Sequence, residues 1–193
     1  MKEIRLHGRG GQGVVVGAEI LASAFISEGK YASVLPMFGV ERRGAPVTAF
    51  LRLDDKPIRE RTGIYTPDCL VIFDPVLENQ PSVFVGLRER SISVLNTTKA
   101  LEEGLHRSLI LVGAIDATQI ALEEIGVPIP NTVIAGAFAA TTGWLILDSI
   151  LASLEDFFED KLLEGNIRCV KRGFHEVKVL KFGEASSAIQ DQV

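Results

Sequence analysis

Apolar and polar residues follow two different periods along this chain of 193 residues. In some stretches every second residue is apolar, or nearly all of them are, and such stretches bounded by turn residues predict β-strands. One run, "DCLVIFD" at 68–74, is uninterrupted, which is typical of a parallel strand buried on both faces. The predicted strands are "KEIRLHG" (2–8), "YASVLPM" (31–37), "VTAFLRLDD" (47–55), "DCLVIFD" (68–74), "SISVLNTT" (91–98) and "LILVGAIDA" (109–117).

Other stretches repeat at the helical period. From Val14 to Glu28 only Glu19, Ser23 and Ser27 form a polar stripe, so most of this helix must be covered, and Gly29 ends it. Asn131 is the predicted N-cap of an Ala- and Gly-rich core helix. The other predicted helices are 118–126, 132–147, 153–162 and 167–180.

This alternation of strands and helices predicts a three-layer α/β/α sandwich, with helices on both faces of a mostly parallel sheet. The chain shows no internal repeat, linker or composition break, so residues 1–193 are expected to form one domain. The small polar segment 183–193 is expected to be a flexible tail.

Composition limits the function classes. Hydrophobic residues make up 47% and the net charge is −5, so no global basic field attracts nucleic acid or an anionic membrane. The N-terminus has no apolar leader, and no apolar run approaches the ~20 residues of a membrane span, which predicts a soluble cytoplasmic protein. Two isolated cysteines, Cys69 and Cys169, are too few for an iron–sulfur cluster or a structural zinc site. We therefore expect no metal in this chain.

The first candidate site is the stretch "HGRGGQGVVVGAEI", in which Gly8, Gly10 and Gly13 have the G-x-G-x-x-G spacing. A strand that runs through glycines into a helix directs backbone N–H groups at an incoming phosphate. A binding loop for NAD also needs an acidic residue about 20 positions later, and "ASVLPMFG" at 32–39 has none. A phosphate site, a disfavoured dinucleotide site and a plain tight turn remain open.

The second candidate is "MFGVERRGAPV" at 37–47, where Arg42 and Arg43 follow a strand that can end at the same sheet edge. Their forked donors suit a phosphate and Glu41 could orient one of them, although a solvated charge cluster is the usual fate of such a pair. Asp74 and Asp116 follow predicted strands and either contact a ligand or cap the next helix. No nucleophile elbow, zinc motif or Walker loop is present, so no autonomous active site is visible.

Taken in order, "HGRGGQGVV", "FGVERRGAPVTAFLR", "DCLVIFDP" and "NTVIAGAFAATTG" resemble the gamma subunit of 2-oxoacid:ferredoxin oxidoreductases, the pyruvate synthase family. The resemblance covers Ile4 to Gly143. It implies a subunit, not catalytic alone, of a complex that converts a 2-oxoacid (pyruvate first) and coenzyme A to acyl-CoA, CO2 and reduced ferredoxin, or the reverse. Alpha, beta and ferredoxin-like delta subunits would carry thiamine diphosphate, Mg²⁺ and [4Fe-4S] clusters.

The resemblance also suggests a ligand for the glycine loop, because coenzyme A carries a pyrophosphate and a ribose phosphate. Gly10, Gly11, Gln12 and Gly13 would contact its phosphates or an adjoining subunit, with Arg42 and Arg43 as counter-charges. The further residues expected at a subunit interface are Arg9, Glu41 and Arg52.

Three alternatives remain at this point. A stand-alone NAD(P)- or flavin-binding oxidoreductase would use the same glycine spacing. A purely structural scaffold would use the loop and the arginines only to hold a neighbouring subunit. The beta chain of indolepyruvate oxidoreductase shares the Gly-rich start, although "ERRGAPV" is closer to the pyruvate and 2-ketoisovalerate group.

Overall fold

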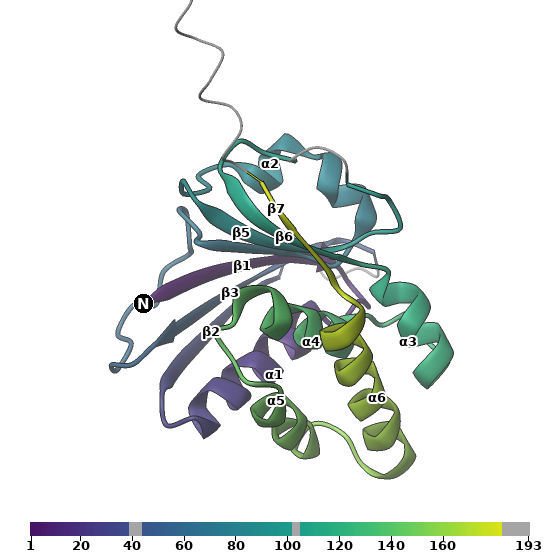
Figure 1. The fold of residues 1–193 in the computed structure, drawn as a ribbon. Coiled ribbons are helices and arrows are strands. Elements are labelled where there is room, and N and C mark those ends of the chain that lie inside the picture. Colours follow the sequence, from purple (N-terminus) through teal and green to yellow (C-terminus); the bar gives the residue numbers. More distant parts are fainter. Residues whose placement is uncertain (39–43, 102–104, 183–193) are drawn as a thin grey trace, which may run out of the picture.

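A computed structural model describes residues 1–38, 44–101 and 105–182 of the chain. A first strand–helix–strand unit is followed by a run of strands, and most of the C-terminal half is a run of helices (Figure 1). The strands are β1 (Lys2–Arg9), β2 (Tyr31–Phe38), β3 (Pro46–Asp54), β4 (Cys69–Ile72), β5 (Ser91–Asn96), β6 (Leu109–Ile115) and β7 (Lys178–Lys181). The helices are α1 (Val14–Ser27), η1 (Pro75–Asn79), α2 (Pro81–Phe84), α3 (Ala117–Ile125), α4 (Asn131–Thr142), α5 (Leu147–Ser153), η2 (Leu154–Asp156) and α6 (Asp160–Glu176).

The strands form one sheet in the order β2-β3-β1-β4-β5-β6-β7. Strands β1, β4, β5 and β6 are mutually parallel, and β4 is buried along its whole length, as its unbroken apolar sequence predicts. Strand β3 lies antiparallel between β2 and β1, and β7 is antiparallel to β6 at the edge. The predicted α/β sandwich with a mostly parallel sheet is confirmed.

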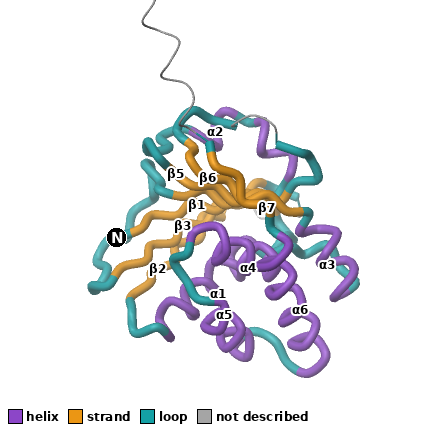
Figure 2. The backbone as a smooth tube through the Cα atoms, in the orientation of Figure 1, coloured by secondary structure: helices purple, strands orange, loops and turns teal. Residues whose placement is uncertain are grey.

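The two faces of the sheet are covered unequally (Figure 2). The helical face carries α1, α3, α4, α5 and α6, and its core includes alternate β1 residues Ile4 and Leu6 together with Phe138 of α4. The thin face carries only η1 and α2, whose Leu77, Val83 and Phe84 pack on side chains of β4, β5 and β6. This second, smaller core stops at β4. Among the described residues, no helix lies over the thin face of β3 and β2, and β1 contacts α2 through the Arg5 side chain, which bonds to the carbonyl oxygen of Val83.

Three predictions about the C-terminal half are wrong. The helix predicted at 132–147 ends at Thr142, because Gly143 takes a left-handed conformation and stops it. Asn131 is the first residue of α4 and Pro130 is its N-cap, so Asn131 does not cap the helix. The helix predicted at 167–180 ends at Glu176, and the residues after Val177 form β7.

The predicted helix at 153–162 also divides, into η2 and the first turn of α6. The proposed tail 183–193 lies outside the described residues.

Helices α4 and α6 cross with their backbones in contact. A Cβ on Gly136 would overlap the carbonyl oxygen of Val170, and a Cβ on Gly173 would overlap the carbonyl oxygen of Val133. Both positions are central to the helical face, where α4 is almost wholly buried. Only glycine permits this crossing, because any side chain would push the helices apart.

We therefore expect Gly136→Ala or Gly173→Ala to lower the free energy of unfolding by at least about 3 kcal/mol, the upper end of the usual cost of overpacking, because backbone atoms cannot relieve the overlap. Urea denaturation of the purified chain measures this. Gly126→Ala is the control, since a Cβ at that position would have nothing within 4 Å and would be strained only by the positive φ. Equal losses in all three variants would contradict the close crossing.

Candidate functional site

The glycine loop lies where the chain leaves the sheet in two opposite directions. After β1 the chain passes through α1 on the helical face toward β2, whereas after β4 it passes through η1 and α2 on the thin face toward β5. Because β1 and β4 are parallel neighbours, their carboxyl ends form a topological switch point, the position at which open α/β sheets bind ligands.

The loop itself is fixed by backbone hydrogen bonds. The N–H of Gly10 donates to the carbonyl oxygen of Ala45 (2.9 Å), and the N–H of Gly44 donates to that of Gly10 (3.3 Å). The side-chain oxygen of Gln12 accepts from the N–H of Arg9 (2.7 Å), so this side chain folds back over the loop. The loop is therefore held in shape before any ligand arrives.

Helix α1 begins at Gly13, its N-cap, which has a left-handed conformation with φ of 72°. Among the described residues, no side chain accepts from the first N–H groups of the helix. A Cβ at this position would lie 2.7 Å from Nδ2 of Asn131 on α4. Uncapped N–H groups and the positive end of the helix dipole attract an anion, so the start of α1 is suited to bind one.

An ion pair closes the switch point. Arg9, at the end of β1, pairs through Nε with the Asp74 carboxylate that follows β4 (2.5 Å). The other oxygen of Asp74 accepts from the N–H of Val76 and caps η1. Asp74 thus has a structural role, one of the two that its sequence position left open.

A cavity of about 490 Å³ opens beside the loop on the helical face. Its walls are mostly apolar, and its polar groups are the amides of Asn131 and Asn166 and the glycine backbone. The lining residues are Gly11, Gly13, Val16, Ile125, Val127, Ile129, Asn131, Phe158, Leu162 and Asn166. The sequence did not single out Asn131 or Asn166 as site residues, because their place here depends on how α4 and α6 pack.

Of the residues predicted around the twin arginines, the structure describes Arg52 but not the arginine pair itself. Arg42, Arg43 and Glu41 lie outside the described residues. Arg52, expected at a subunit interface, is 3% exposed and binds inside this chain, to Glu3 Oε1 (3.0 Å) and to the carbonyl oxygens of Thr62 and Gly63. Its guanidinium fastens the 55–68 connection to the sheet, so we leave Arg52 out of the proposed site.

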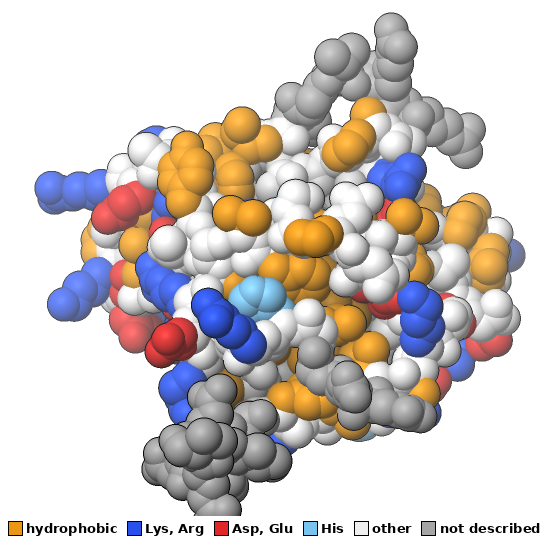
Figure 3. All heavy atoms as spheres, turned by 90° about the horizontal axis from the view of Figure 1, so that it is seen from above, with side chains coloured by type: hydrophobic (Ala, Val, Ile, Leu, Met, Phe, Trp, Pro, Cys, Tyr) orange, Lys and Arg blue, Asp and Glu red, His pale blue; other side chains and the backbone are white. Residues whose placement is uncertain are grey.

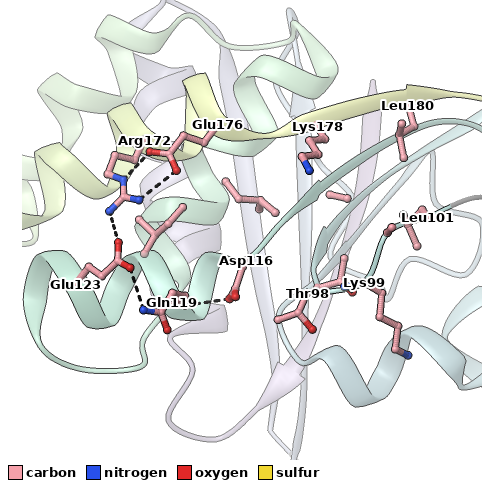
Figure 4. A pocket seen from close by; sticks show the side chains of 15 residues that line it. Thr98, Lys99, Leu101, Asp116, Gln119, Glu123, Arg172, Glu176, Lys178 and Leu180 are labelled. Atoms are coloured by element: carbon pink, nitrogen blue, oxygen red, sulfur yellow. Dashed lines mark hydrogen bonds and ion pairs between the residues drawn. The ribbon is translucent and has the colours of Figure 1, made fainter.

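A second cleft of about 550 Å³ lies at the carboxyl ends of β5 and β6 (Figure 4). Its charged wall is satisfied internally: Arg172 bonds to Glu123 (2.7 Å) and to Glu176 (2.6 Å). Asp116 accepts from the N–H of Gln119 and caps α3, which resolves its ambiguous sequence position in favour of a cap. Charged side chains thus line this cleft, whereas the cavity beside the glycine loop is lined by apolar side chains, asparagine amides and glycine backbone.

Across residues 1–38, 44–101 and 105–182, no three His, Cys, Asp or Glu side chains gather as metal ligands would. Both cysteines are buried, and burial raises their thiol pKa values, which disfavours the thiolate needed for metal binding or nucleophilic attack. Among these same residues, no helix combines the length and apolarity needed to cross a membrane.

The contact between Gly13 and Asn131 generates a prediction. Gly13→Ala should cost about 2–4 kcal/mol of unfolding free energy, since it combines a left-handed alanine with a clash. Gly29→Ala should cost about 1–2 kcal/mol, because Gly29 has φ of 78° but nothing within 4 Å. Thermal denaturation of the purified chains measures both. Adding Asn131→Ala to Gly13→Ala should restore part of the loss, and an unchanged or larger loss would contradict the contact.

Comparison with known proteins places this geometry in a family. The model of the family described as "Pyruvate ferredoxin/flavodoxin oxidoreductase" matches residues 3–176. The "Pyruvate/ketoisovalerate oxidoreductases common subunit gamma" of Pyrococcus abyssi is 47% identical over 184 residues, covering 94% of this chain and all of that one. The "NADH-dependent phenylglyoxylate dehydrogenase subunit gamma" of Aromatoleum evansii is also 47% identical, covering 93% and 95%.

A solved structure supports the same family assignment. Pyruvate oxidoreductase subunit PORC of Thermotoga maritima superposes with a TM-score of 0.81 at 37% identity, covering 92% of this chain and 97% of that one. The resemblance found in the glycine and "ERRGAPV" motifs is confirmed. The chain therefore belongs to the pyruvate ferredoxin/flavodoxin oxidoreductase family, as the gamma-type subunit of a multisubunit 2-oxoacid oxidoreductase.

Proposed function

We propose that this subunit binds the phosphate end of coenzyme A at the glycine loop, with Gly10, Gly11, Gln12 and Gly13 as the backbone cradle. The observation that carries this proposal is an uncapped helix start at the topological switch point, next to a mostly apolar cavity. Coenzyme A has the matching chemistry, because its phosphates are anionic and its pantetheine arm is extended and largely uncharged.

Arg42 and Arg43 are the proposed counter-charges. The residue that follows them, Gly44, donates its N–H to the carbonyl oxygen of Gly10, so the described end of the β2–β3 connection is attached to the loop. Arg9 and Glu41 remain proposed contacts of an adjoining subunit, and the side chain of Arg9 is 41% exposed despite its pairing with Asp74.

The proposed enzyme contains alpha, beta and delta subunits and acts in the cytoplasm. Thiamine diphosphate with Mg²⁺ belongs to the alpha and beta subunits, the [4Fe-4S] clusters belong to partners such as delta, and ferredoxin is the external electron acceptor. The names of the relatives support this division of labour, because each matched protein is itself called a subunit.

Pyruvate is the substrate we propose. Two of the matched proteins name pyruvate, but the phenylglyoxylate relative is just as similar in sequence. The identity of this chain to a relative therefore does not select the 2-oxoacid, which reacts at the thiamine on other subunits.

Replacing Arg42 and Arg43 together by Ala should raise the KM for coenzyme A at least tenfold in the assembled complex and leave the KM for pyruvate unchanged. Charge-assisted hydrogen bonds contribute about 1.5–3 kcal/mol each, and about 1.4 kcal/mol corresponds to tenfold. Steady-state assays with a viologen dye as electron acceptor measure both constants.

Lys171→Ala with Lys181→Ala is the matched control, since it also removes two positive charges, from exposed positions on α6 and β7. An unchanged KM for coenzyme A in an intact Arg42/Arg43 variant complex would reject the coenzyme A proposal. It would favour the scaffold alternative, in which the loop only holds a neighbouring subunit.

Anaerobic purification through a tag on this chain tests the composition of the complex. We expect a brown eluate that absorbs near ~400 nm, as iron–sulfur thiolate centres do, and co-eluting subunits that contain thiamine diphosphate. A colourless chain that elutes alone and binds NAD(P) or a flavin in a titration would instead support a dinucleotide-binding function.

A further inference from the structure

The thin face of β1, β3 and β2 presents two rows of side chains, and among the described residues a helix contacts these rows only at Arg5. Side chains alternate along a strand, and Ile4 and Leu6 point into the core of the helical face, so Arg5 and His7 point to the thin face. The register places Arg5 beside Phe50 and Leu35, and His7 beside Thr48 and Met37. We call these six residues the open sheet face.

Arg5 is a buried cation whose hydrogen-bond partners among the described residues are all neutral. It is 8% exposed, and its Nη2 donates to the carbonyl oxygens of Val83 (2.6 Å) and Val85 (2.9 Å), while Nε donates to Nε2 of His7 (2.9 Å). Burial without a counter-charge lowers the pKa of Arg5 from its ordinary value.

The nearest acidic side chain on its own strand face, Glu3, is already bonded to Arg52 (3.0 Å) and Arg88 (2.8 Å). Within the described parts of the chain, no carboxylate pairs with Arg5 and no acceptor bonds its Nη1.

His7 is held as a neutral donor. A guanidinium only donates, so Nε2 of His7 must accept and the ring proton lies on Nδ1. Burial and the nearby charge of Arg5 lower the pKa of His7 to about 4, so the ring is neutral at physiological pH. Nδ1–H has no acceptor among the residues that the structure describes. Arg5 and His7 together therefore present only donors.

Exposed apolar side chains surround this pair. Tyr65 is 79% exposed, Val85 66% and Met37 50%. The carbonyl oxygen of Val85 accepts a hydrogen bond from Arg5, and the backbone of Tyr65 lies against Gly86. Met37 lies in the same row as His7, two strands away, which separates their backbones by about 10 Å. Seen from the side of η1 and α2, the surface carries several patches of hydrophobic side chains with basic ones between them (Figure 3).

We propose that the open sheet face, with Tyr65 and Val85 at its rim, is the docking surface for another subunit of the complex, which places an Asp or Glu carboxylate against Arg5 and His7. The proposal rests on the subunit role of the chain and not on coenzyme A binding. A donor-only centre selects a carboxylate, and the apolar side chains near it lie on two strands (Leu35, Met37 and Phe50) and two loops (Tyr65 and Val85), which is wider than a small anion covers. Protein interfaces have this anatomy, with an arginine anchor inside an apolar patch.

A second copy of this chain does not fit the same surface. It would bring a donor-only Arg5 and His7 pair of its own, so an isologous contact would supply neither the missing acceptor nor the missing negative charge. The occupant is therefore a different subunit.

Competition for incorporation tests the proposal on the assembled complex. The variant and the wild-type full chain are co-expressed at equal levels with the remaining subunits, the complex is purified through a tag on one of those, and mass spectrometry gives the ratio of the two chains. Val85→Lys adds a positive charge at an exposed position and should be incorporated at least tenfold less than the wild type. Ile146→Lys, 61% exposed before α5 on the helical face, should be incorporated within twofold of it.

Arg5→Met and Arg5→Lys test the charge. The methionine variant should be incorporated at least tenfold less than the wild type, and the lysine variant, which keeps the charge, should recover most of that loss. Wild-type incorporation of Val85→Lys or of Arg5→Met would overturn the proposal, as would equal losses for Val85→Lys and Ile146→Lys. If Arg5→Met lowers the Tm of the chain, the Val85→Lys result alone decides.

The KM for coenzyme A stays unchanged in the Val85→Lys complexes that do assemble, which separates this proposal from the Arg42/Arg43 test.

Discussion

The position of β1 between an antiparallel neighbour, β3, and a parallel neighbour, β4, fixes the place of the candidate phosphate-binding loop. Its carboxyl end meets that of β4 at the switch point, and its loop is bonded on the other side to the residues that lead into β3. The Arg9–Asp74 ion pair joins the two parallel strands at this edge. The strands on both sides therefore fix the position of the glycine loop. The positive end of α1 points at the carboxyl ends of β1 and β4, where it can attract an anion through backbone N–H groups alone.

Unequal covering of the two sheet faces follows from the way the helices pack. Gly136 and Gly173 let α4 and α6 approach to backbone contact, and Phe138 completes a dense core beneath the sheet. On the other face, η1 and α2 are short, and their apolar side chains pack on β4, β5 and β6. Antiparallel strands such as β1, β3 and β2 can leave one face in water, and in a subunit a partner can cover that face instead.

The sequence predicts the elements well where the apolar period is long and fails where tertiary packing decides. The uninterrupted run at 68–74 and the narrow polar stripe of α1 each specify one structure, and both predictions are confirmed. β7 was missed because its four residues continue an amphipathic helical pattern, and only pairing with β6 selects the strand. Arg52 looked like an interface residue because a basic sequence context cannot show that Glu3 and two carbonyl groups from the 55–68 connection bury it.

For the candidate site too, the sequence shows the local features but not those that depend on tertiary packing. The glycine spacing and the missing ribose carboxylate could be found from the sequence, because they are local, and they favour a phosphate ligand over NAD. Asn131 beside Gly13 depends on the packing of α4 against α1, and the isolated charge of Arg5 depends on which carboxylates other arginines have already engaged. Arg5 resembles any strand arginine until its acceptors are known. Because those acceptors are two carbonyl oxygens and a neutral imidazole, the desolvated charge lacks, among the described residues, the counter-ion that a buried cation ordinarily requires, and a docked carboxylate would supply it.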